Sequence, residues 1–176
     1  MPVIQSERLD LRLLTSDDAP FVLGLVNEPS WIQFIGDRGV RTVEQARAYL
    51  EKGPIAMQAR FGFSFYLVEL RSERVPIGIC GLVKRDFLAD ADLGYALLPG
   101  FWGQGYAREA AAAVMQYAAQ ALGLRRLVAI TSGDNERSIR LLAKLGFCSE
   151  GSVAYPDTGE LVQLFGRELA WSGAEE

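Results

Sequence analysis

The residues with the most distinctive chemistry are two glycines in the segment FWGQGYARE, residues 101–109. This segment lies between an apolar, strand-like run that ends at Leu98-Pro99 and an Ala-rich helical pattern that follows it. Glycine lets a backbone approach a ligand closely, and the first N–H groups of a helix have no intrahelical partner. Such N–H groups point at a negative group. The segment therefore predicts an anion-binding loop, and phosphate is the expected guest.

The other reactive side chains restrict the chemistry that the chain can perform. There is no histidine, which excludes Ser-His-Asp and Cys-His catalysis. The two cysteines, Cys80 and Cys148, lie far apart inside apolar runs and are expected to be buried free thiols. With scattered carboxylates and no CxxC pair, we expect no metal site. Proton transfer must then use carboxylates, Tyr, Ser, Cys or water.

Composition narrows the class of protein. At 176 residues and 49% hydrophobic content, the chain is expected to form a single globular domain over residues 1–176. Its apolar runs are too short to span a bilayer and its N-terminus lacks a signal-peptide pattern, so we expect a cytoplasmic protein without a membrane partner. A net charge of -4 argues against a nucleic-acid partner and suits a cationic substrate.

The first half of the chain predicts the elements that lead to the glycine loop. Alternating or continuous apolar residues indicate three strands, and capping patterns at Thr15 and Thr42 indicate two helices. The strands are expected over residues 9–13, 61–69 and 75–83, and the helices over residues 15–27 and 42–53. A polar turn joins the second and third strands, so they are predicted to form a hairpin.

The second half predicts a βαβ unit around the loop. A strand over residues 91–98 leads into the loop, a helix with a small-residue face covers residues 107–122, and residues 127–130 form a buried strand. The two strands should be parallel. A helix after Asn135 and strands over residues 147–153 and 161–169 complete a mixed α/β domain.

Two familiar phosphate loops do not fit this segment. A Walker loop requires GxxxxGK[ST], whereas Gly105 is followed by Tyr106 and Ala107. A dinucleotide fingerprint requires a third glycine where Arg108 stands, and it belongs after the first strand of its domain. Hydrolysis of a nucleoside triphosphate and binding of a dinucleotide both lose support.

Two segments in order resemble the GNAT superfamily of N-acetyltransferases, and most closely its RimJ/RimL-like branch. They are LGYALLPGFWGQGYAREA, residues 93–110, and NERSIRLLAKLGF, residues 135–147. The opening SERLDLR, residues 6–12, and the later DDA, residues 17–19, are similar to the same branch. The resemblance implies a GNAT fold, with a mixed central sheet of about six to seven strands splayed at the cofactor site and about four helices.

The resemblance also implies an acetyl-CoA site. In this family the pyrophosphate sits on a loop of pattern [QR]xxGx[GA], and the matching frame makes backbone N–H groups the phosphate donors. Trp102 replaces Gln or Arg at the first position, which affects only a side-chain contact. Arg108 is either solvated or in contact with a CoA phosphate. The residues of the expected phosphate loop are Trp102, Gly103, Gln104, Gly105, Tyr106, Ala107 and Arg108.

By the same resemblance, the preceding strand pairs its backbone with the pantetheine arm of CoA. Leu97 and Leu98 occupy that place, and a free N–H near them would stabilise the oxyanion of the tetrahedral intermediate by about 3 kcal/mol. Pro99 cannot donate a ladder hydrogen bond, so the strand must end there.

Catalytic roles fall on the residues around this strand and the later helix. Asp92 matches a family position that can act as the base, directly or through water; alternatively it is a carboxylate in a turn at the strand end. Asn135 is a helix N-cap, a contact of the pantetheine or acetyl region, or both. Ser138 is expected to contact CoA and to protonate its thiolate, or simply to allow close packing. The Tyr that many members use as the acid aligns with Leu142.

The expected function is acetyl transfer from acetyl-CoA, as co-substrate, to a primary amine in a ternary complex. A protein N-terminal amine, with a pKa of about 8, needs less help than a lysine amine at about 10.4. A small amine such as a polyamine or an aminoglycoside is the other acceptor considered. Trp31 and Phe34 either line the acceptor cleft or pack in the core.

The alternative function is that of an acyl-CoA-binding regulatory or pseudoenzyme domain, and a nucleotide-binding protein is the third interpretation. The oligomeric state is expected to be a monomer or a homodimer.

Overall fold

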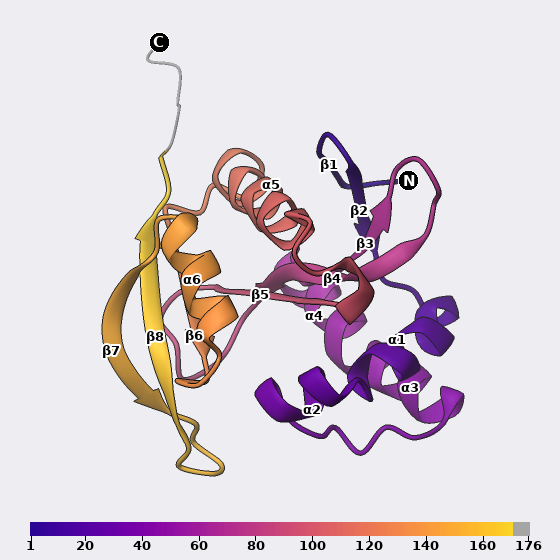
Figure 1. Ribbon diagram of the computed structural model, residues 1–176, viewed down its shortest axis with the longest axis horizontal. Coiled ribbons are helices and arrows are strands. Elements are labelled where there is room, and N and C mark those ends of the chain that lie inside the picture. Colours follow the sequence, from indigo (N-terminus) through magenta and orange to yellow (C-terminus); the bar gives the residue numbers. More distant parts are fainter. Residues whose placement is uncertain (171–176) are drawn as a thin grey trace.

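The computed structural model describes residues 1–170, and an eight-stranded sheet runs through them (Figure 1). Its strands lie in the order β1-β2-β3-β4-β5-β6-β8-β7, and all neighbours are antiparallel except β5 and β6, which are parallel as predicted. The sheet has eight strands, one more than the upper end of the expected six to seven. The strands are β1 (Ile4–Gln5), β2 (Leu9–Leu13), β3 (Phe65–Leu70), β4 (Pro76–Val83), β5 (Asp92–Leu97), β6 (Arg126–Thr131), β7 (Cys148–Ala154) and β8 (Leu161–Glu168).

Helices cover both faces of this sheet. Four of them were predicted, and the two six-residue helices α2 and α4 were not. Short 3-10 turns, Ser16–Asp18 and Pro99–Phe101, precede α1 and the glycine loop. The helices are α1 (Ala19–Val26), α2 (Pro29–Phe34), α3 (Val43–Leu50), α4 (Ala56–Phe61), α5 (Tyr106–Gln120) and α6 (Glu136–Lys144).

The predicted end of the second helix at Gly53 is wrong. The helix continues from α3 through a π-helical turn, Glu51–Ile55, into α4, and it ends where Gly62 adopts a left-handed φ of 77°. The wider π turn accommodates Pro54, which would break a regular α-helix. As a result, Phe61 belongs to a helix, and the predicted strand from residue 61 begins only at Phe65.

Two apolar clusters, one on each face, fix the helices to the sheet. On one face the small side chains of α5, among them Ala111, Val114 and Ala118, pack with Leu142 of α6 against the strands. On the other face, residues of α1 and α3 pack against Leu67 and Ile79. Figure 1 shows α5 on one side of β4 and β5, with α1, α2 and α3 on the other. The small residues let α5 approach the sheet closely.

The two parallel strands separate soon after they meet. Their register is restricted to Asp92 opposite Val128, and the N–H of Val128 donates to the carbonyl oxygen of Ala91 at 3.0 Å. Beyond Asp92 the backbone of β5 has no ladder partner in β6 within residues 1–170. The sheet is therefore open along β5 on the side that leads to the glycine loop.

The cysteines only partly match expectation. Both are free thiols and Cys80 is buried, where burial raises the pKa of its thiol. Cys148 is exposed, contrary to the prediction. It begins β7, which is an edge strand of the sheet and carries mostly exposed side chains. Within residues 1–170, no helix combines the length and the apolarity that crossing a membrane requires.

Candidate active site

The glycine loop opens onto a cavity of about 780 Å³. Residues from α2, β5, β6, α6 and the start of α5 line it, together with part of the segment that joins β7 to β8. Figure 1 shows α6 and α2 near β5, and residues of all three elements line the cavity. The cavity therefore occupies the opening between the two parallel strands.

The loop itself presents a row of unpaired donors. Gly103 and Gly105 have φ values of 74° and 83°, a region that side chains disfavour. Among the described residues, the backbone N–H groups of residues 103–108 donate to no acceptor. Gly105 is the N-cap of the 15-residue helix α5, whose dipole adds partial positive charge at this end. The loop has the geometry of an anion-binding site.

Six of the seven predicted loop residues line the cavity, and Gln104 does not. Its side-chain amide donates to the carbonyl oxygen of Gly100 at 3.2 Å, on the outer side of the loop. A contact between CoA and the Gln104 side chain is therefore not supported, although its backbone N–H remains unpaired.

Trp102 fixes the end of β5 to the loop. Its indole N–H donates to the carbonyl oxygen of Leu97 at 2.9 Å, and the guanidinium of Arg137 lies 4.4 Å from its ring centre. Such a cation–π contact orients both groups. Trp102 thus links β5, the loop and α6, a role that its position in the motif does not reveal.

The two leucines before the loop differ in their backbone hydrogen bonds. The N–H of Leu98 donates to Ile77 of β4 at 2.8 Å, so it is not free for an oxyanion. Because successive backbone groups of a strand point to opposite sides, the N–H of Leu97 faces the open side of β5. Of the two predicted positions, only Leu97 offers a backbone donor to the cavity.

Positive charge is concentrated at the end of the cavity formed by α5 and α6. The lining residues from these two helices include four cationic side chains and no carboxylate, although the whole chain has a net charge of -4. The four are Arg108, Arg137, Arg140 and Lys144. Together with the loop N–H groups, they suit a ligand that carries several phosphates.

Asp92 lies at the point where β5 and β6 part. Its carboxylate is 2% exposed. One oxygen accepts from Arg85 at 2.7 Å, while Oδ1 has no hydrogen-bond partner among the described residues. Burial raises the pKa of Asp92 to about 6, against the opposing effects of the Arg85 guanidinium and of the backbone N–H of Ile130. A buried carboxylate with an unsatisfied oxygen at a cavity wall is suited to accept a proton near neutral pH.

Ser138 has a partner that the sequence does not indicate. Its hydroxyl lies 2.8 Å from the hydroxyl of Tyr95, which projects from β5 towards α6. Burial raises the pKa of Tyr95 to about 12.

Asn135 accepts a hydrogen bond from the N–H of Ser138 at 3.2 Å, which confirms its N-cap role, and it also lines the cavity. Leu142 is 1% exposed and belongs to the core.

The opposite end of the cavity is built from α2 and from the segment that joins β7 to β8. Trp31 and Phe34 of α2 line it, as do Tyr155 and Glu160. Trp31 is only 4% exposed, yet its indole N–H has no acceptor within residues 1–170. A buried donor without a partner is costly, so a ligand oxygen at this position would be favourable.

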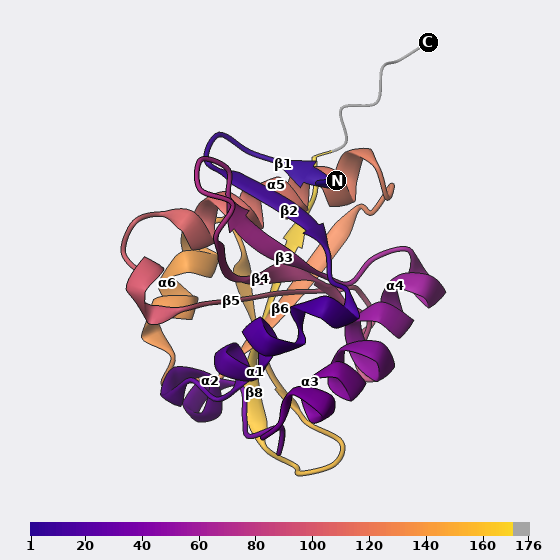
Figure 2. The ribbon, with the colours of Figure 1, turned by 90° about the vertical axis from the view of Figure 1, so that its right-hand side faces the viewer.

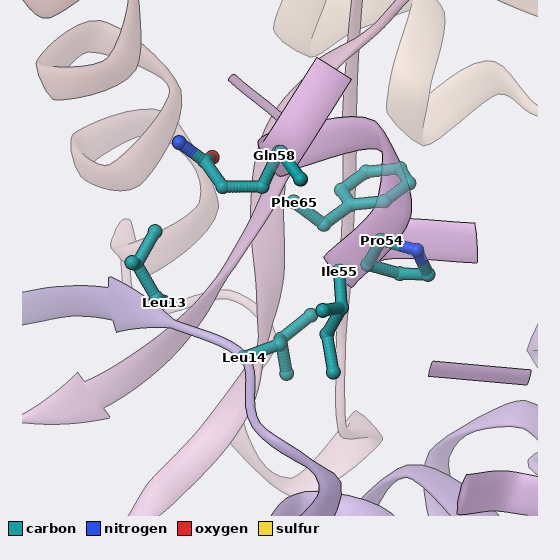
Figure 3. A pocket seen from close by; sticks show the side chains of 7 residues that line it. Leu13, Leu14, Pro54, Ile55, Gln58 and Phe65 are labelled. Carbon is teal, nitrogen blue, oxygen red and sulfur yellow. The ribbon is translucent and has the colours of Figure 1, made fainter. Parts of the chain in front are cut away.

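A second, smaller cavity of about 230 Å³ is unsuited to catalysis (Figure 3). Apart from Gln58, its lining side chains are apolar, and Figure 3 shows Leu14, Ile55 and Pro54 near the ring of Phe65. Phe65 also lines the larger cavity, so it belongs to the walls of both. No titratable side chain lines the smaller cavity.

Comparison with known proteins agrees with this geometry. The sequence profile of the acetyltransferase (GNAT) domain family matches residues 8–148. The chain is 32% identical over 153 residues to the uncharacterised N-acetyltransferase YoaA of Bacillus subtilis, covering 85% of each chain.

Solved structures share the fold. An acetyltransferase from Agrobacterium tumefaciens superposes with a TM-score of 0.79 at 24% identity, over 95% of this chain and 94% of the other. RimL, a ribosomal L7/L12 alpha-N-protein acetyltransferase solved with coenzyme A, gives 0.78 at 24% identity, over 93% and 96%. The profile match and the relative in Bacillus, together with this fold, show that the chain belongs to the GNAT family of acetyltransferases.

Proposed function

We propose that the chain transfers an acetyl group from acetyl-CoA to an α-amine within a ternary complex. The observation that carries this proposal is the row of six unpaired N–H groups, residues 103–108, at the mouth of the cavity between β5 and β6. These groups and the four cationic side chains of α5 and α6 would hold the phosphates of CoA. The pantetheine arm would extend along the open side of β5.

The chemical step would proceed by direct attack of the amine. The nitrogen lone pair forms a bond to the thioester carbonyl carbon, and the π electrons of the carbonyl group move onto its oxygen. The N–H of Leu97, at the far end of β5 from Asp92, would hold the pantetheine arm. Oδ1 of Asp92 takes the proton from nitrogen, directly or through water. The carbon–sulfur bond then breaks, and the electron pair leaves on sulfur, where the Ser138 hydroxyl donates a hydrogen bond. Tyr95 orients that hydroxyl.

The acceptor is inferred from the two unpaired groups in the cavity wall. Within the part of the chain that the structure describes, Oδ1 of Asp92 has no donor and the indole N–H of Trp31 has no acceptor. An α-amine followed by a carbonyl group, as at a protein N-terminus, offers both a donor and an acceptor. A polyamine offers donors only, so it would leave the Trp31 N–H unsatisfied. RimL, whose fold this chain shares, is itself an alpha-N-protein acetyltransferase.

A panel of amines tests this proposal through release of CoA thiol and mass of the product. Peptides with a free α-amine should be acetylated fastest. The same peptides with a blocked N-terminus and one lysine, and spermidine, should react at least about tenfold more slowly, partly because an ε-amine is less deprotonated near pH 7. Fastest turnover of spermidine would contradict the acceptor class. Binding of CoA without turnover of any amine would contradict acetyl transfer.

Replacement of Ser138 by Ala should lower kcat about tenfold, because one hydrogen bond to the departing thiolate is lost. Tyr95→Phe should cause a smaller loss, since it removes only the group that orients Ser138. Tyr66→Phe is the matched control, because Tyr66 is a buried tyrosine of the same sheet that does not line the cavity. Steady-state kinetics measure all three. Unchanged kcat in Ser138→Ala would remove Ser138 from the mechanism.

A further inference from the structure

Arg8 connects the N-terminal part of the chain to the glycine loop. It lies in the turn between β1 and β2, beside the first turn of α5; Figure 2 shows these elements together. Its backbone N–H and its Nε bind the two carboxylate oxygens of Glu109 at 2.8 and 2.7 Å. A further guanidinium nitrogen donates to the carbonyl oxygen of Gln104 at 3.0 Å, and the guanidinium lies 4.4 Å from the ring centre of Tyr106.

The bond to Gln104 sets the direction of a phosphate donor. In a trans peptide the carbonyl oxygen and the N–H of the next residue point in opposite directions. Arg8 holds the carbonyl oxygen of Gln104 on the outside of the loop, so the N–H of Gly105 is directed to the other side. Gly105 lines the cavity and Gln104 does not, in agreement with this orientation.

Arg8 also compensates a charge that opposes phosphate binding. Glu109 stands in the first turn of α5, next to the unpaired N–H groups. Burial raises the pKa of Glu109, but hydrogen bonds from Ser6 and Arg8 outweigh burial and hold it below its usual value. Glu109 is therefore ionised at neutral pH, and without Arg8 its charge would repel a pyrophosphate group.

We propose that Arg8 is a positioning residue for the acetyl donor: it locks the loop in its phosphate-binding conformation and neutralises Glu109. This inference rests on the proposed function, because it takes the loop as the pyrophosphate site. Arg8 itself is not among the residues that line the cavity, so it acts through the loop and not on the reacting atoms. The expected signature is weaker binding of the donor with an unchanged chemical step.

The test compares two acetyl donors in four variants. In Arg8→Ala, the KM for acetyl-CoA should rise about tenfold while kcat stays within about twofold, because the guanidinium loses its charge-assisted hydrogen bonds to Glu109 and to the carbonyl oxygen of Gln104. Acetyl-pantetheine, which lacks the pyrophosphate, should show unchanged kinetics. The KM of Arg8→Lys for acetyl-CoA should lie between those of the wild type and of Arg8→Ala, since lysine keeps the positive charge but lacks the several N–H donors of the guanidinium. The double variant Arg8→Ala/Glu109→Gln should recover part of the loss, because the repelling charge is gone.

Arg71→Ala is the matched control. Arg71 is another exposed arginine of the same corner; it donates to the carbonyl oxygen of Ser6 at 2.7 Å and pairs with Asp10, without contacting the loop. The KM of the Arg71→Ala variant for acetyl-CoA should equal that of the wild type. Direct CoA binding by calorimetry accompanies the kinetics, and a folded Arg8→Lys protein serves if Arg8→Ala does not fold.

Four outcomes would overturn the inference. An unchanged KM in Arg8→Ala and Arg8→Lys would show that the contact does not support donor binding. Equal losses with acetyl-CoA and acetyl-pantetheine would indicate a general structural role. Absence of CoA binding by the wild-type protein would overturn the proposed function together with the inference, whereas equal CoA binding by wild-type and Arg8→Ala proteins would overturn the inference alone.

Discussion

Asp92→Asn is expected to lower kcat/KM for an α-amine substrate by about 100- to 1000-fold, the usual contribution of a positioned general base. The amide keeps the size of the side chain but cannot take a proton from the attacking nitrogen. The KM for acetyl-CoA should change little, because the loop and the cationic side chains would hold the donor. Steady-state kinetics with each substrate varied in turn measure both effects.

The pH profile separates this role from a structural one. With a pKa of about 6, Asp92 is the carboxylate above pH 6. Wild-type kcat/KM should therefore fall about tenfold per pH unit between about pH 8 and pH 6, where the substrate α-amine is protonated, and about a hundredfold per unit below pH 6, where Asp92 is protonated as well. In Asp92→Asn the extra tenfold per unit below pH 6 should disappear, leaving only the limb of the substrate amine. Asp90→Asn is the matched control, since Asp90 pairs with Arg126 outside the cavity. Full activity in Asp92→Asn would exclude Asp92 as the base.

Loss of activity at low pH should not reflect unfolding caused by Asp92. Its pKa is higher in the folded protein than the 3.8 of a free side chain, so the folded state binds the proton more tightly. The contribution of Asp92 to stability therefore rises as pH falls from about 6 to about 4. Thermal unfolding scans across this range distinguish the two effects.

Gly105→Ala is expected to raise the KM for acetyl-CoA at least about tenfold and to lower the free energy of unfolding by about 1–2 kcal/mol. Gly105 has a φ of 83°, and an added Cβ would lie 3.3 Å from a guanidinium nitrogen of Arg8. The loop must shift to relieve both the backbone strain at this positive φ and the close contact with Arg8. This shift moves the N–H groups away from the phosphate. Kinetics and chemical denaturation measure the two consequences.

Gly151→Ala provides the control for backbone strain. Gly151 has a φ of 94° on β7, and an added Cβ would meet no atom within 4 Å. The variant Gly151→Ala should lose about as much free energy of unfolding as Gly105→Ala. Its KM for acetyl-CoA, however, should remain that of the wild type. Equal KM changes in both variants, or none in Gly105→Ala, would contradict the assignment of the loop as the phosphate site.

Local patterns predicted most of the fold. The capping box at Thr42, the apolar run of β6 and the glycines of the loop each act within a few residues, and the structure has these features where they were expected. The end of α4 did not follow from such patterns. Gly53 was interpreted as the end of the helix, but the chain accommodates Gly53 and Pro54 in a π turn that sequence periodicity does not reveal.

The candidate site was predictable where the motif is continuous in sequence, and not where it depends on distant contacts. Asp92 and Ser138 were named from their motif positions, and both line the cavity. The partner of Ser138, Tyr95, lies 43 residues away in sequence. The contact of Arg8 with Glu109 spans 101 residues. Only tertiary packing creates such pairs, so a single sequence carries no local signal for them.

The most direct test of acetyl-CoA use is a crystal structure of the protein with CoA bound. Pyrophosphate oxygens should lie within about 3.2 Å of backbone nitrogens in residues 103–108. The sulfur should lie in the opening between β5 and β6, beside the Ser138 hydroxyl and facing the cavity that Asp92 lines. Phosphates bound away from the loop, or a sulfur remote from both side chains, would contradict acetyl-CoA binding at this site.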